Sequence, residues 1–249
     1  MRHPVLLSVA LAVPIALSVA VPASAGAAAD TAPPIVNVDQ TMRFTTGDVL
    51  SDSTANPTVQ RRLAWKRYDA SGICGQSGAV YERVGNSWSY LVGVGASQTE
   101  VSFPAKVSGY YQLALSVRDC KGNTGTYNRS FYDGSLVQES AYALSPGWTT
   151  ASCTCWSAGS AVKSTKRGAT ATMTTSARAM AVVADRAPDR GIADVYVNGV
   201  RKATVDMRGP KVNRAVIWTG FYATTATREV KVVVRSGRVD VDAFVSSSY

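Results

Sequence analysis

Hydrophobic and polar residues follow one another along the chain with the period of β-strands. From residue 26 onward no stretch places apolar residues at helical spacing, whereas many short runs alternate apolar and polar side chains between Gly, Pro, Asn and Asp. The clearest run in the first half puts Tyr111, Leu113, Leu115 and Val117 on one face of a strand. The chain is therefore predicted to be all-β.

Turn-forming residues connect these runs into hairpins in the first half. The segment 118–124 is rich in turn formers, and 127–131 has the pattern of the returning strand. Further upstream, residues 62–68 alternate, with Leu63 and Trp65 facing inward. This spacing indicates a sandwich of about seven strands with Trp65 in its core.

The strongest local prediction in the second half is a hairpin. Asn198-Gly199, the preferred pair for a type I′ turn, separates the alternating runs 193–197 and 200–206. The same half has five more strand-like runs, at 169–174, 178–184, 214–218, 228–235 and 239–245. We therefore expect a second β-sandwich there.

The first 25 residues have the pattern of an export signal. Arg2 and His3 precede a largely apolar stretch at 5–21, and Ala23-Ser24-Ala25 has the small-x-small pattern that a signal peptidase recognises. We expect cleavage after residue 25; the alternative is an uncleaved N-terminal anchor. The product is then secreted, extracellular or associated with the cell surface, with no transmembrane segment. Because His3 is the only His, it also lacks a His base, a His metal ligand and a Ser-His-Asp triad.

The predicted organisation is thus a signal peptide at 1–25, one sandwich at 26–141 and another at 142–249. The net charge of +9 belongs to the last part: ten basic and ten acidic residues fall between 26 and 142, but fifteen and seven from 143 to 249. Such a surplus favours polyanions, for instance an acidic glycan or an anionic cell-wall polymer, with a solvated surface as the alternative. A specific nucleic-acid site is not predicted, because the basic residues do not interleave with aromatics on one strand face.

Export places the four Cys in an oxidising setting, where disulfides are expected. The spacing favours Cys74–Cys120, which closes a long loop and contributes about 4 kcal/mol. It leaves Cys153–Cys155, which closes a single turn. Crossed pairing between the halves is the competing arrangement.

Several motifs of the first half match a known kind of module. They are the runs 62–69 and 71–74, Gly109-Tyr110-Tyr111, and 117–124 with its Asp-x-x-Gly-Asn ending. With these, the first half resembles the fibronectin type III or immunoglobulin-like modules of secreted bacterial proteins. The resemblance implies a spacer or a recognition unit.

Motifs of the second half match another kind. They are Gly147-Trp148, 168–172, 188–191, 194–199 and 239–245. With these, the second half resembles a galactose-binding-like jelly roll, akin to carbohydrate-binding modules. Those domains commonly carry a His where this chain has Ala226-Thr227-Arg228, which weakens the transfer of ligand-binding detail.

Exposed aromatic rings are the usual means of binding sugars, because the apolar face of a sugar stacks on a ring. Trp156 follows the Cys-Thr-Cys turn, and Trp218 and Tyr222 stand at a predicted strand end. With Arg190 they are the ligand-binding candidates, although core packing explains Trp218 equally well.

A second aromatic patch is possible in the first half. Trp88 and Tyr90 alternate with Ser89 in a short run. An ordinary hairpin explains the pair equally well.

Carboxylates are the remaining candidates for chemistry. Asp185 with Asp189, or Asp240 with Asp242, could form the pair that a glycosidase requires. Solvated side chains at a sheet edge are the simpler interpretation. Related jelly rolls often use an Asp on the last strand for structural calcium, which makes Asp242 the candidate metal ligand. Apart from this possible calcium, no cofactor is expected.

These features predict a secreted, non-catalytic protein rather than an enzyme. Its second domain is expected to bind a polysaccharide or an anionic cell-envelope polymer. The alternatives are a surface component that binds another exported protein and, less favoured, a carboxylate-based envelope hydrolase.

Overall fold

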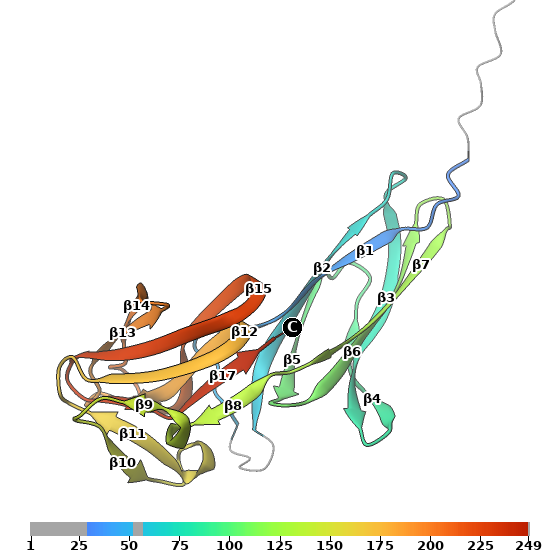
Figure 1. Cartoon of the computed structure of the whole chain (residues 1–249). Coiled ribbons are helices and arrows are strands. Elements are labelled where there is room, and N and C mark those ends of the chain that lie inside the picture. The colour runs from blue at the N-terminus through green and yellow to red at the C-terminus, as the bar shows by residue number, and fades with distance from the viewer. Residues whose placement is uncertain (1–28, 52–56, 249) are drawn as a thin grey trace, which may run out of the picture. The chain divides into compact units, whose positions relative to one another are not determined.

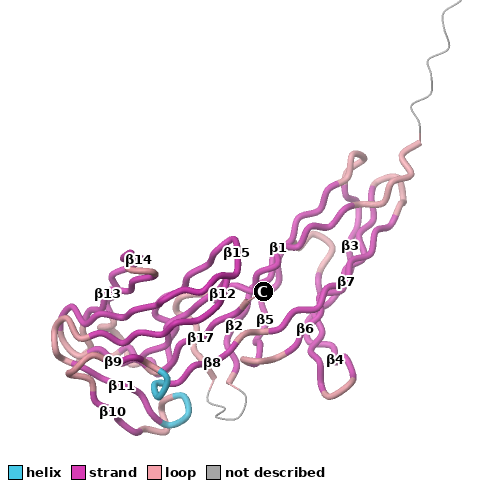
Figure 2. Tube along the Cα trace, in the orientation of Figure 1, coloured by secondary structure: helices cyan, strands magenta, loops and turns pink. Residues whose placement is uncertain are grey.

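The computed structural model describes residues 29–51 and 57–248, and in this part the chain is all-β. The predicted signal peptide, including His3, lies outside the described residues. The only helical segments in the described part are two short 3₁₀ turns, Glu139–Ala141 and Ser157–Gly159, drawn in cyan in Figure 2. No helix within these ranges is long and apolar enough to cross a membrane.

The first seven strands form a sandwich of two antiparallel sheets (Figure 1). One sheet has the order β1-β2-β5, and the other has the order β4-β3-β6-β7. Their bounds are β1 Ile35–Phe44, β2 Thr58–Tyr68, β3 Ile73–Val84, β4 Ser87–Val94, β5 Glu100–Lys106, β6 Tyr110–Asp119 and β7 Thr124–Tyr132. The sandwich of about seven strands is therefore confirmed.

The core of this sandwich contains the side chains that the alternation placed inward. Tyr111, Leu113, Leu115 and Val117 of β6 are all buried. Trp65 of β2 is buried as well, and its indole Nε1 donates to Gln76 Oε1 over 3.0 Å. The ring is thus packed without leaving its N–H unsatisfied, which is the condition for burying a Trp.

A hydrogen bond from the preceding turn fixes the start of β6. The Tyr111 hydroxyl accepts from the backbone N–H of Lys106 over 2.6 Å, which is the tyrosine-corner arrangement of immunoglobulin-like sandwiches. The ring lies directly against Gly109, where a Cβ would stand 2.5 Å from the Tyr111 hydroxyl oxygen. This close approach explains why Gly109 precedes the two tyrosines.

The remaining strands form a second sandwich. A seven-stranded sheet has the order β14-β13-β15-β12-β17-β8, with β9 also paired to β12, and it faces a three-stranded sheet of order β10-β11-β16. Their bounds are β8 Ser135–Gln138, β9 Ala143–Leu144, β10 Thr149–Ser152, β11 Ser160–Ser164, β12 Thr170–Arg186, β13 Ile192–Val197, β14 Val200–Asp206, β15 Val212–Ser236, β16 Val239–Val241 and β17 Ala243–Ser247. Asn198 and Gly199 form the turn between β13 and β14, both with positive φ, as type I′ geometry requires.

The centre of the larger sheet is buried on both faces. Met180 and Val182 of β12 face the core between the two sheets of the second sandwich. Ala179, Ala181 and Val183 belong to another apolar cluster, which includes Leu50 and other residues of the first half. Residues Thr31–Tyr249 accordingly form one compact unit.

A bulge of several residues interrupts the pairing of β12 with β15. Ala177 pairs with Ala226, whereas Ala179 pairs with Phe221, so residues 222–225 bulge out of the ladder. The buried guanidinium of Arg228 donates to the carbonyls of Ala177, Ala226 and Thr224, the last two over 3.0 Å each. Arg228 thus satisfies one carbonyl of the bulge and the two carbonyls of the residue pair beside it.

Candidate functional site

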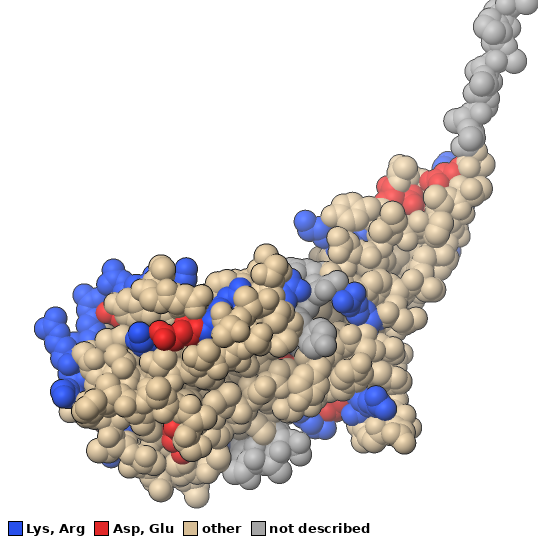
Figure 3. Space-filling model, in the orientation of Figure 1, with Lys and Arg blue, Asp and Glu red and all other residues tan. Residues whose placement is uncertain are grey.

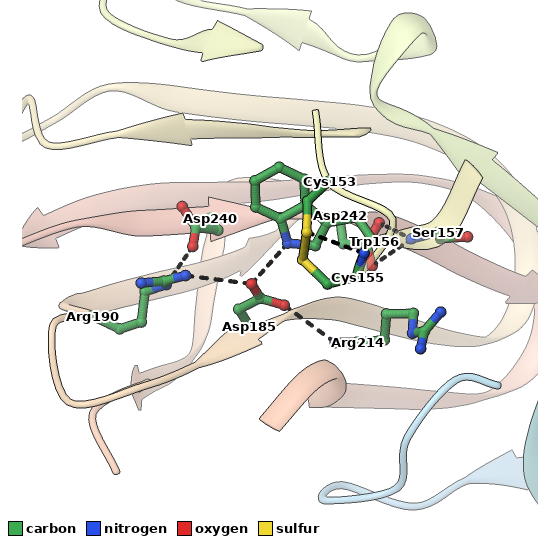
Figure 4. The surroundings of a disulfide bond; sticks show 9 residues. All are labelled: Cys153, Cys155, Trp156, Ser157, Asp185, Arg190, Arg214, Asp240 and Asp242. Carbon is green, nitrogen blue, oxygen red and sulfur yellow. Dashed lines mark hydrogen bonds and ion pairs between the residues drawn. A yellow bond between two sulfur atoms is a disulfide. The ribbon is translucent and has the colours of Figure 1, made fainter. Parts of the chain in front are cut away.

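The expected exposed tryptophans of the second sandwich are buried. Trp156 is 5% exposed and Trp218 is 7% exposed, so neither ring is open for a sugar to stack on. The Trp156 side chain turns inward because its Nε1 donates to the buried carboxylate of Asp185 over 2.7 Å (Figure 4). Trp218 packs in the core between the sheets. The prediction of an exposed aromatic site at these two residues is therefore wrong.

Tyr222 is also only partly accessible. It lies in the bulge of β15, and the guanidinium of Arg228 stands 4.0 Å from the centre of its ring. A cation at this distance covers one face of the ring. The ring also packs against the core of the second sandwich, so little of it is left for a ligand.

Arg190 is the centre of a network of acidic side chains (Figure 4). Its guanidinium contacts Asp185 over 3.3 Å and Asp189 over 2.6 Å, and it forms an ion pair with Asp240. Arg238 also binds Asp240, through Nε over 2.9 Å. With its side chain engaged on three carboxylates, Arg190 holds the structure together rather than pointing at a ligand.

Asp242 stands at a corner where the chain passes from one sheet to the other. β16 pairs in the small sheet and β17 in the large sheet, and Asp242 is the residue between them. Its carboxylate accepts from the backbone N–H of Ser157 over 2.9 Å, and its own N–H donates to the carbonyl of Val183. Burial raises the pKa of Asp242 to about 8. Asp242 therefore joins the corner between β16 and β17 to the turn at Ser157 and to β12.

Asp242 stands apart from other candidate metal ligands. In the described ranges, it belongs to no group of three or more His, Cys, Asp or Glu side chains close enough to share one ion. Its carboxyl group is engaged with the backbone N–H of Ser157. The calcium-ligand role of Asp242 stays a prediction.

The two carboxylate pairs considered for a hydrolase are engaged in the same region. Asp185, Asp240 and Asp242 are buried, and their partners are the side chains and backbone groups described above. Asp189, the exposed member, pairs with Arg190. Neither pair has both of its carboxyl groups exposed.

The four cysteines form the two disulfides that their spacing favours. Cys74 is joined to Cys120, and Cys153 to Cys155. The small second ring is tied to the turn that follows it, because Trp156 N–H donates to the Cys153 carbonyl over 3.1 Å. The turn places the Trp156 ring within hydrogen-bonding distance of Asp185.

A set of exposed aromatic side chains lies instead on the first sandwich. We call it the aromatic face; it comprises Trp88 and Tyr90 of β4, Tyr110 of β6 and Tyr132 of β7, which are 39%, 66%, 37% and 40% exposed. Tyr110 stands on the side of β6 opposite the buried Tyr111, and it is paired across the strands with Tyr132. The face is thus the outer surface of the β4-β3-β6-β7 sheet.

The aromatic face is ordered by contacts between its own members. The rings of Trp88 and Tyr110 stack with centroids 5.7 Å apart and an angle of 29° between their planes, although β3 lies between their strands. Tyr90 meets Tyr81 of β3 edge to face at 6.2 Å. Rings held in this way lose little conformational freedom when a ligand binds.

Polar groups continue the same surface away from the rings. Beyond Tyr110, Gln112 and Ser116 point outward from β6, and Gln112 Nε2 donates to Ser130 Oγ over 3.5 Å. A depression of about 340 Å³ lies at the far end, lined in part by Ser77, Ser116 and Arg118. From Tyr110 to Arg118 the strand runs roughly 27 Å, at about 3.4 Å per residue. Rings and hydrogen-bonding groups are therefore arranged along one line.

The basic surplus is found on the second sandwich. Figure 3 shows Lys and Arg side chains gathered over the part that carries β13 and β14. Arg201, Lys202, Arg208 and Lys211 are exposed in this part of the chain. Arg208 is paired with Asp206 over 2.7 Å, so part of this charge is neutralised locally.

Sequence reasoning found half of the aromatic face. Trp88 and Tyr90 were recognisable as a patch, but Tyr110 and Tyr132 were not, because each neighbours a strongly buried residue in its strand. The signal that identifies them is the outward register: on β6 the inward set begins at Tyr111, which leaves Tyr110 on the outer side.

Comparison with known proteins gives low similarity only. No protein-family model and no curated protein sequence matches the chain. Among solved structures, one of the CBM51-2 module in complex with GlcNAc and the INT domains from Clostridium perfringens ZmpB matches at 14% identity and a TM-score of 0.33, over 57% of this chain and 38% of that one. An exo-β-1,3-galactanase from Phanerochaete chrysosporium with galactose matches at 10% identity and a TM-score of 0.38, over 87% and 68%.

A third match concerns carbohydrate-binding modules of the β-sandwich superfamily. It has 11% identity and a TM-score of 0.27, over 87% of this chain and 98% of that one. All three likenesses are at low identity, and the chain spans well under half of the first structure named. No site residue carries over at this level.

Proposed function

We propose that the protein is a non-catalytic glycan-binding protein and that it binds through the aromatic face of the first sandwich. The observation that carries the proposal is the stacked pair Trp88–Tyr110, flanked by Tyr90 and Tyr132 on an open sheet surface. Monomer surfaces seldom expose several large aromatic rings side by side without a partner. Sugar rings suit such a surface, because their apolar faces stack on it while hydroxyls bond to nearby polar groups.

The polar continuation of the face supports an extended ligand. Gln112, Ser116 and Arg118 lie in line with the rings along β6. A single sugar cannot span this length, whereas a polysaccharide chain can contact both ends. We therefore propose a polysaccharide or cell-wall glycan as the ligand, recognised by the first sandwich rather than the second.

The remaining parts of the proposal concern location and organisation. Two disulfides suit an exported protein, since such bonds persist in oxidising compartments. We propose that the chain is secreted after cleavage of residues 1–25. In this arrangement an immunoglobulin- or fibronectin-like module carries the glycan, and a jelly-roll domain is joined to it.

The test is co-sedimentation of the purified chain with insoluble polysaccharides and purified cell walls. Trp88→Ala and Tyr110→Ala each remove one ring of the stacked pair, and retention is expected to fall about tenfold or more in each. The scale is taken from nucleobases, whose stacking on one aromatic side chain contributes roughly 1–3 kcal/mol.

The matched control is Tyr68→Ala, because Tyr68 is also exposed but lies on β2 of the other sheet. Retention equal to that of the unaltered chain is expected for this variant. Undiminished retention of both Trp88→Ala and Tyr110→Ala contradicts the proposal. If the chain binds no polysaccharide and instead co-purifies with a stoichiometric exported protein, the face is a protein-binding surface.

A further inference from the structure

A separate pocket lies in the second sandwich, at one end of the small sheet, where β10 and β16 begin and β11 ends. Its volume is about 330 Å³. The residues that line it come from three segments that the β10-β11-β16 sheet brings together: Gly147, Thr149, Lys163, Ser164, Thr165 and Arg238. None of the lining residues is acidic, and two are cationic.

The two cations of the pocket are held differently. Arg238 is fixed by its neighbours, since its Nε donates to Asp240 over 2.9 Å and its Nη1 lies 3.5 Å from Asp189. Lys163 pairs across the strands with Asp240 in the backbone register. Within the described part of the chain, however, its ammonium has no carboxylate within 4 Å, because Asp240 is occupied by Arg190 and Arg238. The pocket therefore combines a fixed guanidinium with an ammonium available to an anion.

The wall between these cations is ordered by hydrogen bonds. Ser164 Oγ donates to the Gly147 carbonyl over 2.7 Å and accepts from the Lys166 N–H over 3.1 Å. The aliphatic part of the Lys166 side chain lies against Gly147, where a Cβ would stand 2.7 Å from the Lys166 Cδ. The side chain of a third cationic residue therefore lies beside the pocket. Thr165 adds a hydroxyl group to the lining, whereas the Thr149 hydroxyl donates to the Lys163 carbonyl over 3.5 Å.

We infer that this pocket binds an oxyanion group carried by a saccharide, either a carboxylate or a phosphate ester. The Lys163 ammonium and the Arg238 guanidinium both line it, and charge-assisted hydrogen bonds from such groups are among the strongest in proteins. A pocket of this size accommodates the charged group together with part of one sugar. The saccharide part of the inference rests on the proposed function, whereas the binding of the oxyanion does not.

The experiment follows backbone amide signals of the purified chain by NMR during titration with inorganic phosphate, D-glucuronate, glucose 6-phosphate and glucose. Saturable shifts of the Thr149, Lys163 and Thr165 amides are expected with phosphate and with at least one anionic sugar, and none with glucose. A response to glucuronate but not glucose 6-phosphate assigns the carboxylate, and the reverse assigns the phosphate ester. Saturation by inorganic phosphate alone, an adventitious ion only, overturns the inference.

Variants separate this site from general charge effects. Lys163→Gln is expected to weaken the binding of the anionic sugar about tenfold, which corresponds to about 1.4 kcal/mol. Lys211→Gln removes an exposed positive charge that does not line the pocket, and it should leave the affinity unchanged. An equal loss in both variants, or no loss in Lys163→Gln, overturns the inference.

A final pair of measurements distinguishes this inference from the proposed function. Trp88→Ala removes a ring of the first sandwich and should leave the amide shifts in the pocket intact. Lys163→Gln should leave retention on neutral polysaccharide intact. Failure of the aromatic face therefore shows in sedimentation, and failure of the pocket shows in the titration.

Discussion

At the scale of single residues, Asp242 shows how burial changes the acid–base behaviour of a carboxyl group. The corner between β16 and β17 needs an acceptor for the Ser157 N–H, and Asp242 supplies it from a buried position. Its pKa rises to about 8 because burial disfavours the charged form.

This pKa predicts how stability depends on pH. Between about pH 4 and pH 8 the unfolded chain has released the Asp242 proton while the folded chain retains it, so the free energy of unfolding falls as pH rises through this window. Asp242→Asn keeps an acceptor for Ser157 and removes the proton, so the decline should become shallower by up to about 1.4 kcal/mol per pH unit. Denaturant melts at several pH values measure this slope. Asp206→Asn is the control, because the pKa of the exposed Asp206 is lowered to about 2, outside the window, and an equal change there contradicts the assignment.

A second prediction at this scale concerns the stability of the Gly109→Ala variant. A methyl group there meets the Tyr111 ring and hydroxyl below 3 Å, so Gly109→Ala forces the tyrosine corner to shift. Overpacking of this kind costs about 1–3 kcal/mol. Gly95→Ala is the matched control, because the nearest atom to its new methyl group is the flexible Gln98 side chain at 3.4 Å. Chemical denaturation measures both, and equal stability of the two variants refutes the packing argument.

At the scale of elements, the bulge of β15 explains what the sequence could and could not predict. The alternation of β6 and the Asn198-Gly199 turn are local signals, and both elements appear where they were expected. The pattern predicted two strands at 214–218 and 228–235, but both belong to the single strand β15. The pairing of β15 with β12 continues on both sides of the bulge, so the bulge does not end the strand. The burial of Trp156 was unpredictable for a similar reason: its partner, Asp185, lies far along the chain.

Arg228 is expected to be essential to this bulge. Arg228→Met removes the donor for three carbonyls, of which that of Ala177 lies in a buried place, so we expect a loss of about 1–3 kcal/mol in the free energy of unfolding. Arg235→Met on the same strand removes an exposed ion pair to Asp194 and an exposed hydrogen bond to Thr204, and should cost less than about 1 kcal/mol. Thermal and urea melts measure both. Similar losses for the two variants mean that the bulge does not depend on the buried guanidinium.

At the scale of the whole molecule, the apolar cluster on the outer face of the large sheet argues against two independent modules. Leu50, Phe44 and Val59 from the first half are buried in one cluster with Ala181 and Val245 of the second. Backbone hydrogen bonds reinforce it, for example from Leu50 N–H to the Arg214 carbonyl over 2.9 Å. The alternation of each strand is visible in the sequence, but which outer face is covered is not, because it depends on residues more than a hundred positions away.

Unfolding of the whole chain is therefore expected to be cooperative across both sandwiches. Leu50→Ala leaves a cavity in the shared cluster and should cost about 2–5 kcal/mol. Because the cavity adjoins β12 and β17, protection against amide hydrogen exchange should fall in those strands as well as beside residue 50. Leu113→Ala is the comparison, because Leu113 is buried within the first sandwich. This variant should lower the exchange protection of β3, β6 and β7 but not that of β12 and β17. If Leu50→Ala leaves exchange in β12 and β17 unchanged, the two sandwiches unfold separately, and a ligand bound to the aromatic face cannot stabilise the domain that carries the oxyanion pocket.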